Sequence, residues 1–239
     1  MKLIDFDEIF NRAMERELTE HAGERTEEEW ESAIAYAYAS FGRTVLKELG
    51  KTPVQYFADM SDAQLCETLK EYILQDVPVP DFLVEELSSR GAVPELMALL
   101  NETDEELVMY ALGALGPDRR AVPRYAAMLG EDAYDEHVKD HLAELLKERA
   151  DDAADAMLAL AKTENAPYAL EVLSKVKKRD ERVYAVLLSA FRAADEEELP
   201  LYAGYLASYG DERALPVLLS EIEREDIGFV AFQELKYAI

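Results

Sequence analysis

ALGALGPDRRAVPRYAAML (Ala111–Leu129) contains the end of one predicted helix, a tight turn and the start of the next helix. Gly116 ends the first helix, because glycine tolerates the positive φ that is common after a helix C-terminus. Pro123 lies in the first turn of the second helix, where its missing N–H has no helical partner to lose. A similar sequence, LASYGDERALPVLLSEI, returns at Leu206–Ile222. Such internal similarity indicates a helical repeat.

The repeat extends over residues 91–239 with a period that can be followed through its helix starts. Helix starts of one kind fall at Pro94, Pro123 and Pro216, and comparable apolar runs follow Asp155 and Tyr184 between them. The intervals along these five positions are 29, 32, 29 and 32 residues. Each interval accommodates two short helices, and a helix pair of this kind must stack on others to bury its apolar face. We therefore expect about five helix pairs in residues 91–239. Residues 1–90 are predicted to be helical without a clear period.

The quoted stretches at 111–129 and 206–222 resemble HEAT-like repeats of the short type also found in phycobilisome lyases. The resemblance covers residues 91–239. It implies an all-α, right-handed solenoid, capped by residues 1–90, in which the second helix of each pair lines a concave face. One departure is that Val108-Met109 and Val138-Lys139 replace the Val-Arg pair usual in such repeats. The resemblance implies a binding scaffold more than a particular activity.

Local signals place several helix ends in the N-terminal region. Thr26-Glu-Glu-Glu29 and Ser61-Asp-Ala-Gln64 are predicted capping boxes. The helix after Thr26 is predicted to continue to Gly50, with a bend at Gly42. The sequence then predicts an extended connector at 77–80, because each proline disfavours helix at the residue before it.

The chain carries 25 basic and 51 acidic residues, a net charge of −26 that is spread along its length. This charge opposes binding to nucleic acid and to anionic membranes and favours basic partners. The single cysteine, Cys66, cannot form an internal disulfide, which suits a reducing compartment. The sequence shows neither a signal peptide nor an apolar run of about 20 residues. We therefore expect a cytoplasmic protein.

Two groups of residues are candidates for sites of chemistry. His137 and His141 are four residues apart on a predicted helix, with Glu144 one turn further, a spacing that can bind a metal. The alternative is that these residues form the polar flank of a helix beside its apolar stripe. We expect this alternative, and we expect no bound metal. Cys66 fits a small buried hydrophobe better than an activated thiolate. With no GxSxG and no phosphate-binding glycine loop, we expect no catalytic residue and no cofactor.

Two further groups are candidates for binding sites. Lys175–Arg179 and Arg182 form the one basic cluster, which is expected to be a solvated helix end that offsets the helix dipole. The chain has 13 tyrosines, and several fall on predicted second helices. Tyrosine supplies large contact area at low entropic cost, as at protein interfaces. The alternative for each tyrosine is a place in the core. The predicted partner-binding residues are Tyr110, Tyr168, Tyr202 and Tyr205.

The sequence thus favours a non-enzymatic scaffold that binds a protein or peptide, and a basic segment above all, through acidic second helices such as 104–115 and 134–149. One alternative is an enzyme on a HEAT-like fold, either lyase-like or glycosylase-like, although a glycosylase needs a cationic groove. The other alternative is an acidic mimic of nucleic acid, which requires carboxylates gathered on one face.

Overall fold

The computed structural model describes residues 3–21, 26–224 and 227–238, and these residues form helices and turns without a β-strand. The prediction of an all-α protein is confirmed for this part of the chain. Two compact units are present, Met1–Leu115 (unit 1) and Gly116–Ile239 (unit 2). None of the described helices is both long enough and apolar enough to cross a lipid bilayer.

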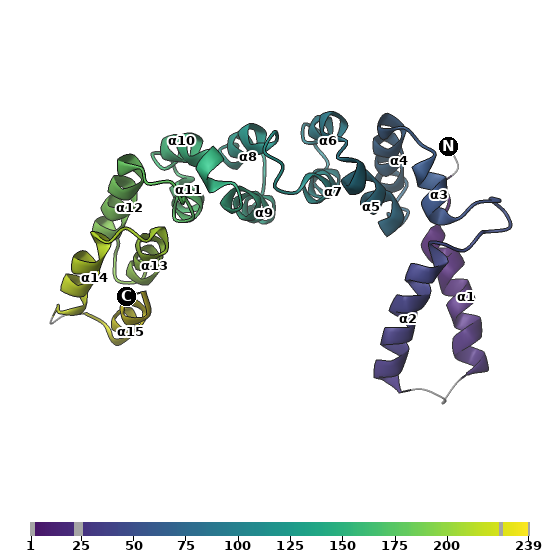
Figure 1. Ribbon diagram of the computed structural model, residues 1–239, viewed down its shortest axis with the longest axis horizontal. Helices are drawn as coiled ribbons and strands as arrows, with labels where there is room; N and C mark the ends of the chain where they lie inside the picture. The colour runs from purple at the N-terminus through teal and green to yellow at the C-terminus, as the bar shows by residue number, and fades with distance from the viewer. Residues whose placement is uncertain (1–2, 22–25, 225–226, 239) are drawn as a thin grey trace. The chain divides into compact units, whose positions relative to one another are not determined.

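Unit 1 begins with two longer helices and continues with shorter ones that pack on one another (Figure 1). The fifth helix contacts the third, fourth and seventh, and the sixth packs along the seventh. The bounds are α1 Phe6–Glu20, α2 Glu27–Phe41, α3 Pro53–Ala58, α4 Asp62–Leu74, α5 Asp81–Arg90, α6 Val93–Leu99 and α7 Glu105–Leu115.

The contacts place α6 and α7 in unit 1, although both helices follow residue 90. The compact units and the predicted repeat region therefore have different limits. The prediction of a repeat region at residues 91–239 concerns sequence similarity rather than compactness, and its limits stay a prediction.

Capping boxes start three helices of unit 1. At the start of α2, Thr26 N–H donates to Glu29 Oε2 (2.8 Å) and Glu29 N–H donates to Thr26 Oγ1 (3.3 Å). Ser61 and Gln64 form the same reciprocal pair before α4, so both predicted boxes are confirmed. A third box, which the sequence analysis missed, joins Thr52 to Gln55 before α3. Each box satisfies backbone donors that the first helical turn leaves free.

The predicted continuation of the second helix to Gly50 is wrong, because α2 ends at Phe41. At Gly42 a Cβ atom would collide with the Phe82 ring, so glycine permits a close approach of the backbone to α5. The Gly42 carbonyl accepts the Val54 N–H (3.2 Å) from α3 instead of continuing the helix. The chain therefore turns here for a tertiary reason that helical periodicity does not report.

Aromatic side chains form much of the core of unit 1. Phe10 contacts Tyr38 edge to face, and Tyr38 stacks on Phe82 with ring centroids 5.2 Å apart. Such pairs add packing energy beyond the area they bury. Tyr72, fully buried, donates its hydroxyl proton to the Ile4 carbonyl (2.7 Å) and holds the N-terminal segment against α4.

Unit 2 consists of helices that form two rows (Figure 1). In one row α9 contacts α11, α11 contacts α13, and α13 contacts α15. In the other row α8 contacts α10 and α10 contacts α12, whereas α14 contacts α13 and α15. The bounds are α8 Val122–Leu129, α9 Glu136–Lys147, α10 Ala150–Leu160, α11 Ala166–Leu173, α12 Glu181–Ala193, α13 Leu199–Tyr209, α14 Ala214–Ile222 and α15 Phe229–Ala238.

The turn before α8 has the predicted features. Gly116 has a φ of +53°, and Pro123 lies in the first turn of α8. The fully buried Tyr125 donates its hydroxyl proton to the Gly116 carbonyl (2.9 Å) and so ties α8 to this turn. The buried hydroxyl thereby satisfies a carbonyl that the turn leaves without a helical partner.

Three turns of unit 2 share an Asp-x-Arg arrangement in which the carboxylate accepts both the backbone N–H and the guanidinium of the arginine. The pairs are Asp118 with Arg120, Asp180 with Arg182, and Asp211 with Arg213. The bonds to arginine lower the pKa of Asp118 and of Asp211 to about 2. Two of these arginines also form ion pairs with carboxylates of other helices. Arg182 pairs with Asp155 of α10 (2.8 Å), and Arg213 pairs with Glu181 of α12 (2.9 Å).

Candidate partner-binding surface

The tyrosines of helix α13 differ in how far they are buried. Leu199, Ala203 and Leu206 are buried, and the helix turns Tyr202 and Tyr205 to a half-buried position beside them. Their ring centroids lie 6.0 Å apart with the planes tilted by 54°. Both rings of the pair are therefore partly accessible to solvent.

Tyr209, one turn further along α13, is buried and does not belong to this exposed pair. Its hydroxyl accepts the Asp180 N–H (2.8 Å) and donates to the Asp180 carbonyl (3.1 Å). Tyr209 thus joins α13 to the start of α12.

Tyr168 lies in the first turn of α11, directly after Pro167, and is half-buried. Burial is the largest cause of its raised pKa, and nearby carboxylates raise the pKa further. These carboxylates belong to Asp140, Glu136, Glu171 and Asp135. The phenol therefore stays a neutral hydroxyl inside a negative field.

Glu171 connects the tyrosines of α11 and α13. Its charge raises the pKa of Tyr168 and also that of Tyr205, which reaches about 12 with burial as the largest cause. The pKa of Tyr202 is raised as well, first by burial and then by Glu198 and Asp195. We call Tyr168, Tyr202 and Tyr205 the tyrosine cluster.

Sequence reasoning missed the two charged residues beside this cluster. Lys147 of α9 donates to Glu171 and to Glu144, both at 2.6 Å. Glu171 lies three residues after Tyr168, a helical spacing that could have signalled its place on the same face. The pairing to Lys147 cannot be read from sequence, because the two residues are on different helices.

Tyr110, the fourth predicted residue, lies on α7 of unit 1 and is half-buried. Burial raises its pKa, with further contributions from Glu106, Asp81 and Asp7. Its surroundings therefore combine an aromatic ring with carboxylates, as those of the tyrosine cluster do. Within unit 2, Tyr202 and Tyr205 lie next to each other, and Glu171 acts on both Tyr205 and Tyr168. Tyr110 lies in unit 1.

The histidines of α9 have different environments. His137 is exposed, whereas His141 is half-buried and its Nε2 has no hydrogen-bond partner among the described residues. Burial, followed by the charge of His137, lowers the pKa of His141. The Glu144 carboxylate accepts Lys147. Within residues 3–21, 26–224 and 227–238, no three His, Cys, Asp or Glu side chains are grouped so that they could hold a metal ion.

The basic cluster at 175–179 joins adjacent helices of unit 2. Lys175 Nζ lies 3.0 Å from Ser208 Oγ, and the backbone N–H groups of Lys177 and Lys178 donate to Asp151. Arg179 lies over the Tyr209 ring, 5.6 Å from its centroid. These contacts give most of the cluster a structural role, in addition to the expected position after the C-terminus of α11.

Cys66 is buried on α4. Burial, followed by the charges of Glu95 and Asp62, raises the pKa of its thiol to about 11. A thiol with this pKa is protonated near neutral pH and is a weak nucleophile.

The class defined by this architecture is that of all-helical proteins. Comparison with known protein families, with curated proteins and with solved structures gives no match for this chain. The resemblance to HEAT-like repeats therefore stays a prediction.

Proposed function

We propose that this chain is a non-enzymatic scaffold of the cytoplasm, built as a right-handed HEAT-like α-solenoid capped by residues 1–90. In this proposal the row α9, α11 and α13 binds a basic segment of a protein or peptide. The two-row packing of unit 2 and its repeated Asp-x-Arg turns support the repeat architecture.

The observation that carries the binding proposal is that tyrosines of α11 and α13 lie in the field of carboxylates from α9, α11 and the start of α13. A cation of the partner gains Coulomb attraction from Asp135, Asp140 and Glu198, and it can lie over the Tyr202 or Tyr205 ring. An apolar side chain of the partner gains contact with the same half-buried rings. Charge then speeds encounter, and the aromatic contacts slow dissociation.

Lys147 limits where such a partner binds. Its ammonium already pairs with Glu171 at 2.6 Å, so a cation of the partner competes there with an intramolecular one. The carboxylates of Asp135, Asp140 and Glu198 are therefore the stronger attractors. Tyr110, with Glu106 and Asp81, offers the same chemistry in unit 1 as a separate contact.

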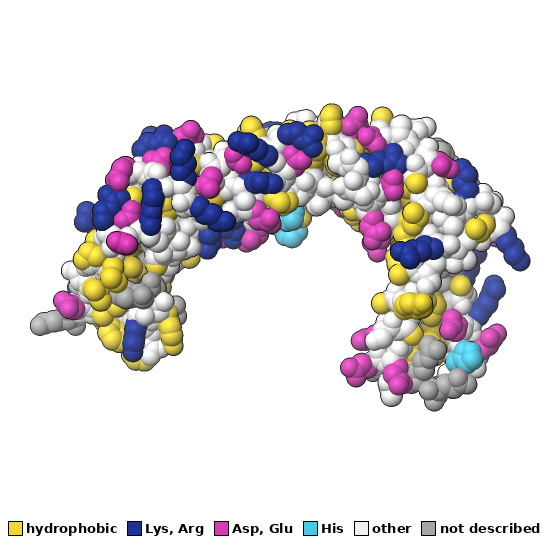
Figure 2. Space-filling view, in the orientation of Figure 1, with side chains coloured by type: hydrophobic (Ala, Val, Ile, Leu, Met, Phe, Trp, Pro, Cys, Tyr) yellow, Lys and Arg dark blue, Asp and Glu magenta, His cyan; other side chains and the backbone are white. Residues whose placement is uncertain are grey.

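The distribution of charge favours this reading over an acidic mimic of nucleic acid. On the face shown in Figure 2, Lys and Arg side chains lie among the carboxylates over α8–α14. A mimic of a phosphate backbone requires an uninterrupted series of negative charges. Unit 2 instead offers discrete acidic and aromatic positions.

The test is the binding of a short peptide of Arg and Phe, kept extended by prolines, to the full chain. We expect Tyr168→Ala and Tyr205→Ala each to weaken binding by about 1–2 kcal/mol, mainly through a faster off-rate, as for interface anchors. Binding should also weaken from low to physiological salt, because charge is screened beyond about 8 Å. Surface plasmon resonance measures both effects.

Tyr237→Ala is the matched control, because Tyr237 is 82% exposed on α15 of the same unit. It should leave peptide binding unchanged. The proposal fails if both cluster variants bind like the unmodified chain, or if duplex DNA binds at physiological salt.

A further inference from the structure

An apolar groove lies between α1 and α2 in unit 1, and none of the tyrosine cluster lines it. It has a volume of about 490 Å³. Figure 1 shows the two helices side by side, and both are 15 residues long. The residues that line the groove are Phe10, Ala13, Met14 and Glu17 of α1, and Ala33, Tyr36, Ala37, Ser40, Phe41 and Thr44 of α2 and the turn after it.

The lining residues follow helical periodicity on both sides. On α1 they recur at 10, 13, 14 and 17, and on α2 at 33, 36, 37 and 40. Positions i, i+3, i+4 and i+7 form a continuous stripe along one helix. Two such stripes side by side form a groove in which a third helix can bind, with its large side chains packed between the two stripes.

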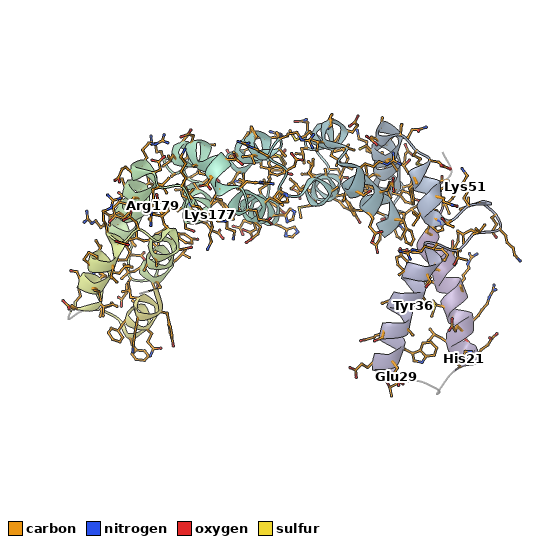
Figure 3. The ribbon with its side chains drawn as sticks, in the orientation of Figure 1. His21, Glu29, Tyr36, Lys51, Lys177 and Arg179 are labelled. Carbon is orange, nitrogen blue, oxygen red and sulfur yellow. The ribbon has the colours of Figure 1, made fainter. Side chains whose placement is uncertain are left out.

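The exposure of the lining side chains shows that α1 and α2, here called the hairpin, do not fill the groove themselves. Phe10 and Met14 are each 7% exposed and form the floor, whereas Tyr36 is 78% exposed on α2 (Figure 3). Ala33 and Ala37 are half-buried and too small to fill the space between the helices. An apolar groove of this kind favours a partner with bulky apolar side chains.

The negative charge of the hairpin favours a partner with positively charged polar residues. Residues 5–41 contain 11 acidic and 3 basic side chains, a net charge of −8. Glu17 lines the groove, and no Lys or Arg is among the lining residues. A helix flanked by Lys or Arg therefore gains Coulomb attraction as it binds, whereas an acidic helix is repelled.

We propose that the groove between α1 and α2 binds a basic amphipathic helix of another protein. The two hairpin helices are each about 22 Å long at 1.5 Å per residue, so they match about 15 residues of a bound helix. The apolar stripe of the bound helix faces Ala33 and Ala37, and its cations flank the acidic outer sides of the hairpin. This site is in unit 1 and does not depend on the tyrosine cluster of unit 2.

The probe is a synthetic amphipathic peptide of about 15 Leu and Lys residues with helical periodicity. A scrambled peptide of the same composition, without the apolar stripe, is the first control. Fluorescence anisotropy with the full chain should show binding of the periodic peptide at least about tenfold tighter than that of the scrambled one. Equal affinities would mean that charge alone attracts the peptide, and they would overturn the proposal.

Substitutions in α2 locate the site. Ala37→Arg places a long cation in the groove, and Ala35→Arg makes the same change of charge at an exposed position outside the lining. We expect Ala37→Arg to weaken binding of the periodic peptide about tenfold or more and Ala35→Arg to have little effect. Circular dichroism checks that both variants keep their helices. Equal weakening by the two variants would overturn the proposal.

Tyr36→Ser keeps the test valid if Ala37→Arg fails to fold, because Tyr36 is largely exposed. It should weaken binding of the periodic peptide, and Tyr168→Ala should not, whatever the outcome for the tyrosine cluster. If the unmodified chain instead forms a dimer in sedimentation and Tyr36→Ser makes it monomeric, a second copy occupies the groove and the proposal is wrong.

Discussion

At His141 a ring nitrogen is buried without a hydrogen-bond partner among the described residues, beside the apolar stripe of α9. Burial disfavours the charged ring, and the neighbouring His137 adds to this effect. The neighbouring carboxylate of Glu144 favours the charged form but does not outweigh burial. The same position that a sequence pattern suggests for a metal is therefore a position where a neutral imidazole packs.

The lowered pKa of His141 makes the stability of the fold depend on pH. A histidine whose pKa is lower in the folded than in the unfolded state binds more protons when unfolded, so its protonation favours unfolding. This group should therefore destabilise the protein as pH falls through about 6.5, the unfolded value. We expect His141→Leu to reduce the loss of stability between neutral and mildly acidic pH.

Urea unfolding followed by circular dichroism at both pH values measures this loss. His137→Gln is the matched control, and it should keep most of the pH dependence because burial, the larger cause, remains. An unchanged dependence in His141→Leu would contradict the prediction.

At the ends of helices the local sequence predicts the backbone conformation most closely. After α7, Gly116 adopts a φ of +53°, although a Cβ there would meet nothing within 4 Å. Its requirement for glycine is therefore conformational. Gly113, three residues earlier inside α7, also has free space around it but has a helical conformation.

This difference gives opposite expectations for the same substitution. Gly116→Ala should destabilise the protein by about 1 kcal/mol, because a side chain is strained at this φ. Gly113→Ala should stabilise it by about 0.5–1 kcal/mol, because alanine loses less entropy in a helix. Chemical denaturation of the two variants measures both changes. Shifts of the same sign would show that the φ at Gly116 is not the limiting factor.

For the whole molecule, the sequence combines a repeating helix pattern with a net charge of −26. A solenoid grows by adding helix pairs in one direction, so its radius of gyration increases faster with length than that of a globular domain. A globular chain of 239 residues has a radius of gyration of roughly 18 Å. The solenoid proposal predicts a clearly larger value by small-angle X-ray scattering at moderate salt. A value near the globular one would contradict it.

Local signals in the sequence were sufficient for the all-α class and for many helix ends. The boxes at Thr26 and Ser61, the positive φ at Gly116 and the place of Pro123 all depend on residues within a few positions of one another. Interactions of this range act before any tertiary contact forms, so they can be predicted from neighbouring residues. The end of α2 at Phe41 could not be predicted in this way, because it depends on the close approach of Gly42 to Phe82, 40 residues further along the chain.

The candidate sites show the same division. The sequence alone determined that Tyr168, Tyr202 and Tyr205 lie on helices and that the chain is strongly acidic. Only the tertiary structure decided that Glu171 lies near both Tyr168 and Tyr205 and that α1 and α2 leave an apolar groove between them. The physical reason is that helical periodicity specifies which side of a helix is apolar, whereas the register in which two helices pack depends on side chains far apart in the sequence.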